Sequence, residues 1–166
     1  MAKKKHTVSQ SRITTSHIVL PGDTNTHGSI FGGIVMQWID IAATIAAVRH
    51  CRSNVVTASI DELHFLNPIL LGYHVYITAE VSYTGRSSME IEVRVESENP
   101  LTAERQVTSV AYLTFVALDA KSGHPTAVPP IVPETPEEMQ RYAAAKKRKE
   151  ARMANLAELK ERVARA

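Results

Sequence analysis

The feature that most limits the fold of this chain is an apolar segment with almost no polar face. Residues 33–50 read GIVMQWIDIAATIAAVRH, and the polar side chains before the last turn are Gln37, Asp40 and Thr44. These three recur at helical spacing, so they form one narrow stripe on an otherwise apolar helix. Such a helix must be surrounded by protein or lipid. A carboxylate inside a membrane span costs about 2.5–3.5 kcal/mol, so we expect a sheet wrapped around the helix.

Strand signals fill most of the chain up to residue 118. Residues 88–96 alternate between apolar and mostly charged side chains, which is typical of a strand with one buried face. Four further segments are rich in β-branched and aromatic residues: 12–20, 55–65, 73–83 and 106–118. Successive strands joined by short turns are antiparallel, so the sequence predicts an α+β domain of about five strands around one central helix.

A proline-rich segment follows these strands. Residues 124–136 hold five of the eight prolines and are expected to be extended, either as an ordered segment or as a linker. Thr135, Pro136 and Glu138 then supply the N-cap, first-position and N3 signals of a helix. We expect that helix to run close to the C-terminus, because neither Gly nor Pro follows residue 136.

This terminal helix looks like an appendage. Its middle lacks large apolar side chains, so we expect that part to be solvated. An apolar face returns near the end, formed by Met153, Leu156, Leu159 and Val163. The sequence therefore divides into a domain over residues 10–133 and a helical extension over residues 134–166.

Charge is distributed unevenly along the chain. The net charge is +2, yet residues 6–133 hold seven basic against eleven acidic side chains. A mildly acidic domain argues against a nucleic-acid surface, and the basic run at 146–149 is weak evidence for one. The start of the chain has no apolar stretch, and a single cysteine excludes an internal disulfide or a Cys-cluster zinc site. We expect a cytoplasmic protein with no metal, nucleic-acid or membrane partner.

A glycine-rich loop leads directly into the apolar helix. Residues 23–33 read DTNTHGSIFGG. Gly32 and Gly33 permit close approach to the backbone and leave the first helical N–H groups uncovered. Those donors and the helix dipole suit an oxyanion or a polarised carbonyl. The alternative is a tight loop that only packs against the sheet.

Asp40 lies about two turns into the helix. A carboxylate in apolar surroundings is unfavourable unless it has a partner or a task. It is either a general base or nucleophile, or a structural residue bonded to Gln37, Thr44 or nearby backbone. A second polar cluster, residues 84–88 (TGRSS), puts a cation and hydroxyls at a turn. That turn suits a phosphate or is simply a solvated hairpin.

Residues 25–40, NTHGSIFGGIVMQWID, resemble the signature of the hotdog-fold acyl-CoA thioesterases, in the cytosolic or brain-type group. The similarity spans about residues 10–140 and includes segments 49–51, 56–61, 87–93 and 132–135. It implies a hotdog fold and dimers with a continuous sheet, commonly assembled as trimers of dimers. In such families the active site lies across the dimer interface.

The resemblance also implies hydrolysis of acyl-CoA to free coenzyme A and a carboxylic acid, without a further cofactor. The family's catalytic asparagine and aspartate fall on Asn25 and Asp40. Asp40 would act as general base on water, or attack directly, while Asn25 orients the water or the carbonyl. N–H groups at Gly32 and Gly33 would hold the oxyanion. The expected substrate-binding residues are His27, Gly28, Thr57, Ala58, Ser59, Arg86, Ser87 and Ser88.

Two other functions compete with hydrolysis. A hotdog hydratase or dehydratase needs a histidine with a carboxylate, and His64 beside Phe65 superficially suits that chemistry. A non-catalytic acyl-CoA-binding regulator would need an output element, for which only the basic terminal helix is a candidate. Asn25 and Asp40 together favour hydrolysis.

Overall fold

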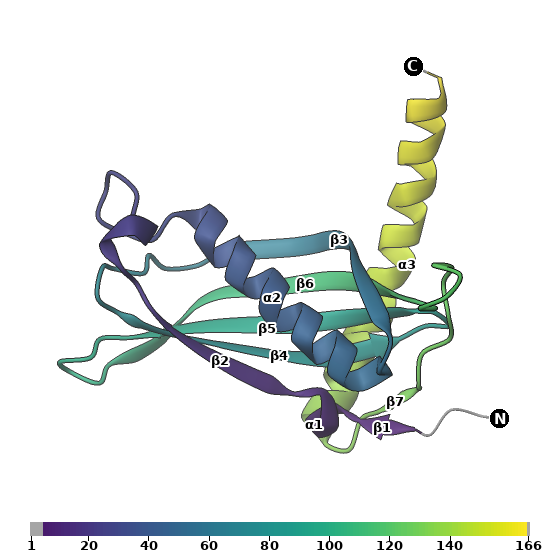
Figure 1. The fold of residues 1–166 in the computed structure, drawn as a ribbon, viewed down its shortest axis with the longest axis horizontal. Helices are drawn as coiled ribbons and strands as arrows, with labels where there is room; N and C mark the ends of the chain where they lie inside the picture. Colours follow the sequence, from purple (N-terminus) through teal and green to yellow (C-terminus); the bar gives the residue numbers. More distant parts are fainter. Residues whose placement is uncertain (1–4, 166) are drawn as a thin grey trace.

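An antiparallel sheet curves around one long helix, as the residue pattern predicts (Figure 1). The structure is a computed structural model in which residues 5–165 are described. Across the sheet the strands run in the order β2 (Ile13–Ile18), β4 (His74–Thr84), β5 (Ser88–Glu98), β6 (Arg105–Leu118) and β3 (Asn54–Phe65). Each strand lies within two residues of its predicted bounds, so the five-stranded α+β prediction is confirmed.

Helix α2 (Gly32–Cys51) lies across the concave face of this sheet (Figure 1). Its buried face is built mainly from alanines, which let the helix approach the strands closely. The buried apolar residues of this face are Val35, Ile39, Ala42, Ala43, Ala46 and Ala47. They pack against the inward side chains of the strands, among them the predicted alternating series Met89, Ile91, Val93 and Val95.

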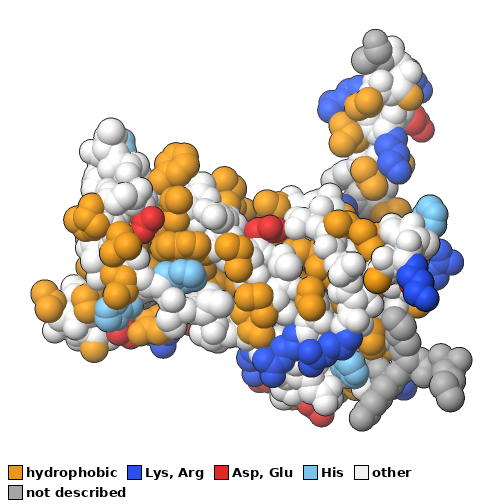
Figure 2. Space-filling model, in the orientation of Figure 1, with side chains coloured by type: hydrophobic (Ala, Val, Ile, Leu, Met, Phe, Trp, Pro, Cys, Tyr) orange, Lys and Arg blue, Asp and Glu red, His pale blue; other side chains and the backbone are white. Residues whose placement is uncertain are grey.

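The opposite face of α2 is apolar but uncovered within one chain. Met36, Ile41, Ile45 and Val48 are each at least 40% exposed. Figure 2 shows hydrophobic side chains gathered along this side of the molecule. The expectation that protein surrounds the helix on all sides is therefore only half met by the single chain. By length and composition α2 also qualifies as a membrane span, although its sheet-facing side is buried in the fold.

The proline-rich segment is ordered and lies against the N-terminal residues. Short strands β1 (His6–Thr7) and β7 (Ile131–Val132) pair in parallel. Between β1 and β2 lies α1 (Val8–Ser11), and a 3₁₀ turn, η1 (Pro21–Asp23), follows β2. The ring Nε2 of buried His50, at the end of α2, lies 2.8 Å from the carbonyl oxygen of Pro129.

Helix α3 (Pro136–Ala164) starts as predicted. The Thr135 hydroxyl accepts a hydrogen bond from the N–H of Glu138 at 3.2 Å. The Glu138 carboxylate accepts from the N–H of Glu134 at 2.7 Å, one residue before the N-cap position expected for a capping box. Figure 1 shows α3 crossing the side of the sheet away from α2 and then projecting beyond it.

The prediction that the middle of α3 is solvated is wrong on the side that faces the sheet, although Lys146, Lys147 and Glu150 are exposed as expected. The Arg148 side chain is 19% exposed, pairs with Glu90 and lies over the ring of Tyr112 at 3.7 Å. Two further arginines on α3 also pair with acids on the sheet, in the pairs Arg141–Glu80 and Arg152–Asp61. The prediction considered only apolar side chains, whereas arginine buries its stem and charge when a carboxylate is present. The apolar face of Met153, Leu156, Leu159 and Val163 is at least 37% exposed at each position.

Candidate active site

The loop before α2 is held in place by the side chain of Asn25. Its Oδ1 accepts a hydrogen bond from the N–H of His27 at 2.8 Å, and its Nδ2 donates to the hydroxyl of Ser29 at 3.1 Å. An isolated bridge between Thr24 and Ile30 closes the loop. Gly28 has φ +77°, a conformation that favours glycine at this turn. Asn25, His27 and Gly28 therefore belong to one organised loop.

The first turn of α2 offers free backbone donors. The N–H groups of Gly32 and Gly33 have no backbone or side-chain acceptor among residues 5–165. A Cβ at Gly33 would lie 2.5 Å from Cε1 of Phe31, so this position has no room for a side chain while that ring keeps its place. The geometry fits the predicted oxyanion-binding role, since donors at a helix N-terminus favour negative charge.

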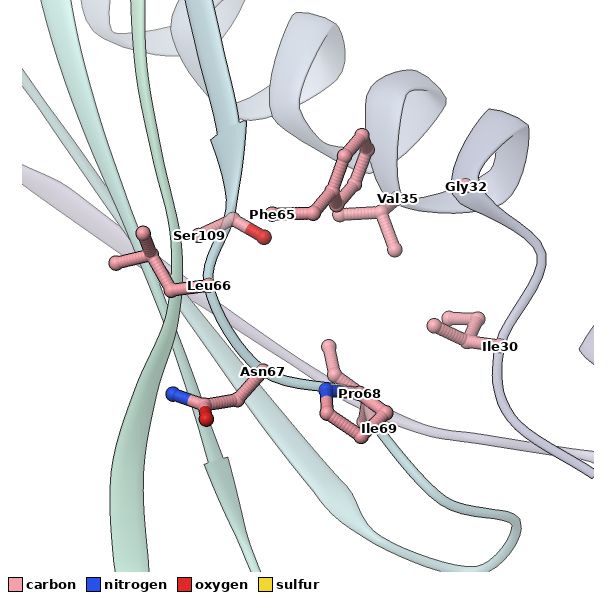
Figure 3. Close-up of a pocket in the computed structure, with 9 residues that line it drawn as sticks. All are labelled: Ile30, Gly32, Val35, Phe65, Leu66, Asn67, Pro68, Ile69 and Ser109. Atoms are coloured by element: carbon pink, nitrogen blue, oxygen red, sulfur yellow. The ribbon is translucent and has the colours of Figure 1, made fainter.

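A cavity of about 280 Å³ opens beside Gly32 (Figure 3). Its lining comes from the loop before α2, the start of α2, the end of β3, the segment that follows β3, and β6. These residues are Ile30, Gly32, Val35, Phe65, Leu66, Asn67, Pro68, Ile69 and Ser109. Apolar side chains dominate the lining, as is usual for small-molecule sites.

Asp40 meets Thr57 from strand β3. The Thr57 hydroxyl donates to Oδ1 of Asp40 at 2.8 Å. The structural partners considered from the sequence, Gln37 and Thr44, make no hydrogen bond to Asp40, and no cation pairs with it among the described residues. Asp40 therefore keeps a carboxylate oxygen that no hydrogen bond within the described chain occupies.

The predicted trio on β3 is divided between the two faces of the sheet. A bulge interrupts the pairing with β6 between Thr57 and Ser59. Thr57 consequently faces α2, while the Ser59 hydroxyl donates to Asp61, whose other oxygen meets Arg152 of α3. Bulges re-aim side chains in this way, and strand periodicity alone does not reveal them.

The turn between β4 and β5 carries the predicted anion-binding residues. Arg86 is exposed, and Ser87 and Ser88 are half-buried. Lys149 of α3 reaches the same turn. Its Nζ lies so close to Gly85 that a Cβ added to this glycine would be only 2.8 Å from it. The sequence pattern did not indicate this contact of Lys149, since the run at 146–149 resembled a solvated stretch.

The structure does not assemble a hydratase-like pair in the cavity. The Nε2 of His64 lies 3.6 Å from a carboxylate oxygen of Glu62, but both side chains are largely exposed. His64 does not line the cavity, although its neighbour Phe65 does. Asn25 makes no hydrogen bond to Asp40 within the chain.

Comparison with known proteins gives a consistent result. Residues 27–104 match the thioesterase superfamily. The chain is 44% identical over 139 residues to the uncharacterized acyl-CoA thioester hydrolase YkhA of Bacillus subtilis, covering 84% of this chain and 80% of that protein. It is 38% identical over 145 residues to the cytosolic acyl coenzyme A thioester hydrolase of Rattus norvegicus, covering 86% of this chain but only 38% of that longer protein.

Solved structures agree with these relatives. An acyl-CoA hydrolase from Staphylococcus aureus, in complex with butyryl coenzyme A, coenzyme A and coenzyme A disulfide, has a TM-score of 0.90 at 39% identity, covering 96% of this chain and 97% of that one. The structures of three alanine mutants of that hydrolase are also similar to this chain. The replaced residues are an aspartate, a threonine and an asparagine. An apo hexameric acyl-CoA thioesterase has a TM-score of 0.90 at 44% identity, covering 93% and 99%. The hotdog fold is thereby confirmed, and the chain belongs to the acyl-CoA thioester hydrolases of the thioesterase superfamily.

Proposed function

We propose that this protein hydrolyses acyl-CoA thioesters to coenzyme A and a carboxylic acid. The observation that carries the proposal is Asp40, a carboxylate that has no cation partner among the described residues and that Thr57 holds through one oxygen. The family to which the chain belongs indicates the substrate class, acyl-CoA thioesters. A carboxylate in this state is available to take a proton from water, as general base catalysis requires.

The proposed reaction uses few groups. Asp40 removes a proton from a water molecule as the water oxygen attacks the thioester carbonyl carbon. The carbonyl oxygen gains the negative charge and accepts hydrogen bonds from the N–H groups of Gly32 and Gly33. Collapse of the intermediate breaks the C–S bond, and the departing thiolate takes the proton from Asp40. Direct attack by Asp40 to form an anhydride is the alternative mechanism.

One helix cannot supply all of these groups to one substrate. Asp40 follows Gly32 by eight residues, which places it about 12 Å further along the helix axis. A general base must lie within hydrogen-bond reach of the attacking water. We propose that a second chain, related by a two-fold axis, brings its Asp40 to the Asn25 and Gly32 of the first.

Three positions in a related protein support the roles of Asn25, Asp40 and Thr57. The asparagine, aspartate and threonine replaced in the Staphylococcus aureus hydrolase are successively 15 and 17 residues apart, the same separations as between these residues here. We propose that Asn25 orients the water or carbonyl. Thr57, expected from the sequence only to line the coenzyme A path, positions the Asp40 carboxylate.

The coenzyme A phosphates are proposed to meet Arg86, Ser87 and Ser88. Lys149 adds a second cation at this turn, which strengthens its suitability for phosphate. His27, Gly28, Thr57, Ala58 and Ser59 remain predicted contacts for the rest of the ligand. Because Ser59 faces away from α2, its contact would have to be made on the outer side of β3.

The proposed assembly is a dimer with a continuous sheet, three of which form a hexamer. The edge strand β3 exposes Val56 and Ile60, each at least 45%. Together with the uncovered face of α2, these residues form an apolar surface of the kind that oligomer interfaces bury. The similar hexameric thioesterase supports the higher assembly. We also propose a cytoplasmic location, supported by the cytosolic relative, and keep residues 10–133 as the catalytic unit.

The direct test is release of free thiol from acyl-CoA, measured over acyl chains of increasing length. Hydrolysis predicts stoichiometric coenzyme A and carboxylic acid. A hydratase would alter the acyl chain while the thioester remains, and a regulator would bind acyl-CoA without turnover. The absence of thiol release with every chain length would overturn the proposal.

A further inference from the structure

One buried hydroxyl stands out in the largely apolar cavity beside Gly32. Ser109 on β6 is 1% exposed, and its Oγ has no hydrogen-bond partner among the described residues. Figure 3 shows this oxygen directed into the cavity, opposite Ile30 and Val35. Asn67, the other polar side chain of the lining, points away and donates to the carbonyl of Val107 at 2.9 Å.

A serine at this position departs from the pattern of its strand. The inward positions of β6 that follow Ser109 are Ala111, Leu113, Phe115 and Ala117, all buried and apolar. An alanine in place of Ser109 would continue that series. A buried hydroxyl without a partner is unfavourable by about 1–3 kcal/mol. Such a group is expected to find its hydrogen bond in something that enters the cavity.

The position of the cavity indicates what enters. Gly32 is part of the lining and also one of the two donors proposed to hold the thioester carbonyl. An acyl chain bound at Gly32 can therefore extend past Ile30 and Val35 toward Ser109. Its hydroxyl both donates and accepts, so it can pair with an oxo or a hydroxyl group on that chain.

We propose that this cavity is the acyl pocket and that Ser109 selects acyl groups carrying an oxygen substituent. The inference rests on the proposed thioesterase function and adds a specificity residue to it. A site that hydrogen-bonds a substrate oxygen rejects the analogue without it, because the buried partner is then left unpaired. A saturated chain of equal length would leave Ser109 without that bond.

The chain offers a matched control at Ser97. This residue ends the inward series of β5, is 0% exposed and also has an Oγ without a partner among the described residues, but it does not line the cavity. Ser109→Ala and Ser97→Ala thus remove equivalent hydroxyls from equivalent strand ends. Ser109→Cys keeps the shape of the side chain with a slightly larger atom and weakens the donor. Thermal unfolding of all three variants verifies that they fold.

The experiment compares kcat/KM for butyryl-CoA with kcat/KM for its 2-, 3- and 4-hydroxy and 3-oxo derivatives. The wild type should prefer at least one oxygenated thioester. Ser109→Ala should reduce that preference about tenfold, the equivalent of one hydrogen bond. Ser109→Cys should reduce it less, and Ser97→Ala should leave it unchanged.

Three results would overturn the inference: no preference in the wild type, a preference that survives Ser109→Ala, or an equal loss in Ser97→Ala. Hydrolysis of butyryl-CoA with any of these results removes only the role of Ser109. Failure of the wild type to hydrolyse any of the thioesters would remove the proposed function and this inference together.

Discussion

The two faces of the sheet hold their helices by different forces. On the inner face, α2 packs through alanines and other apolar side chains, an attraction that is non-directional. On the outer face, α3 buries Ala145 but is also held by arginines that pair with buried or half-buried acids, as in Arg148–Glu90 and Arg152–Asp61. Guanidinium–carboxylate pairs are directional, so they define where α3 lies along the sheet.

The two faces also differ in how many partners their carboxylates have. Asp61 accepts hydrogen bonds from the hydroxyls of Ser59 and Thr114 and from Arg152. Among the described residues, Asp40 accepts a hydrogen bond only from Thr57 and forms no ion pair. The Asp61 carboxylate is thus fully paired within one chain, whereas the inner face keeps a carboxylate oxygen that has no hydrogen bond among the described residues, and an uncovered helix surface. We infer that the inner face is the one a substrate and a second chain complete.

The largest expected effect is on kcat and follows from replacing Asp40, the carboxylate on the inner face of the sheet. Asp40→Asn keeps the size of the side chain but cannot take a proton, so kcat should fall by about 10²–10⁴-fold. Asp61→Asn is the matched control on the outer face; it should lower stability and leave the kcat of the folded enzyme close to wild type. Thiol release and urea unfolding of both variants check the contrast, and equal kcat in the two would contradict it.

The next effect concerns the ion pairs of α3. Arg148→Met leaves the Glu90 carboxylate, 1% exposed, without its cation. The free energy of unfolding should fall by about 3–5 kcal/mol, because an uncompensated buried charge remains. Arg165→Met removes a pair with Glu161 in which both side chains are at least 71% exposed, and it should change stability little. Similar midpoints of urea unfolding for both variants would show that α3 is not held by buried charge.

A smaller effect is expected at the hydroxyl that positions Asp40. Thr57→Val removes the hydrogen bond to Oδ1 while keeping the shape of the side chain, so kcat/KM should fall about tenfold. Thr14→Val removes a hydroxyl that lies 3.0 Å from that of Thr78, away from the inner helix. Steady-state kinetics should distinguish the two, and an unchanged rate for Thr57→Val would separate this residue from catalysis.

The smallest effect is on the pH dependence of stability. Burial lowers the pKa of His50 below its usual value, because removal from water disfavours the charged imidazolium. The unfolded chain then takes up the proton first, so His50 lowers stability as the pH falls from about 6.5 toward its folded pKa. Unfolding at pH 7.5 and 5.5 should differ less in His50→Gln than in the wild type. An identical difference would show that His50 does not contribute.

The sequence predicts the scaffold far better than the site. Alternation located β5, because the side-chain period follows directly from strand geometry, and β-branched and aromatic residues located the other four strands of the sheet. Arg148 and Lys149 were misread, since the contact of a cation with a carboxylate or an aromatic ring leaves no apolar pattern in the sequence. The bulge after Thr57 could not be predicted from the sequence either, because it depends on how β3 pairs with β6. Ser109 did leave a signal, as the one polar residue at the start of an apolar inward series.

The measurement that tests the central claim most directly mixes two inactive proteins. Asn25→Ala and Asp40→Ala chains are unfolded together, refolded at equal amounts and assayed for thiol release, with mixed dimers verified by native mass spectrometry. If the inner faces of two chains share each site, every mixed dimer holds one intact Asn25–Asp40 combination. Random pairing then restores about a quarter of the wild-type sites. Mixed dimers without activity would contradict the account, because they would show that Asn25 and Asp40 act within one chain.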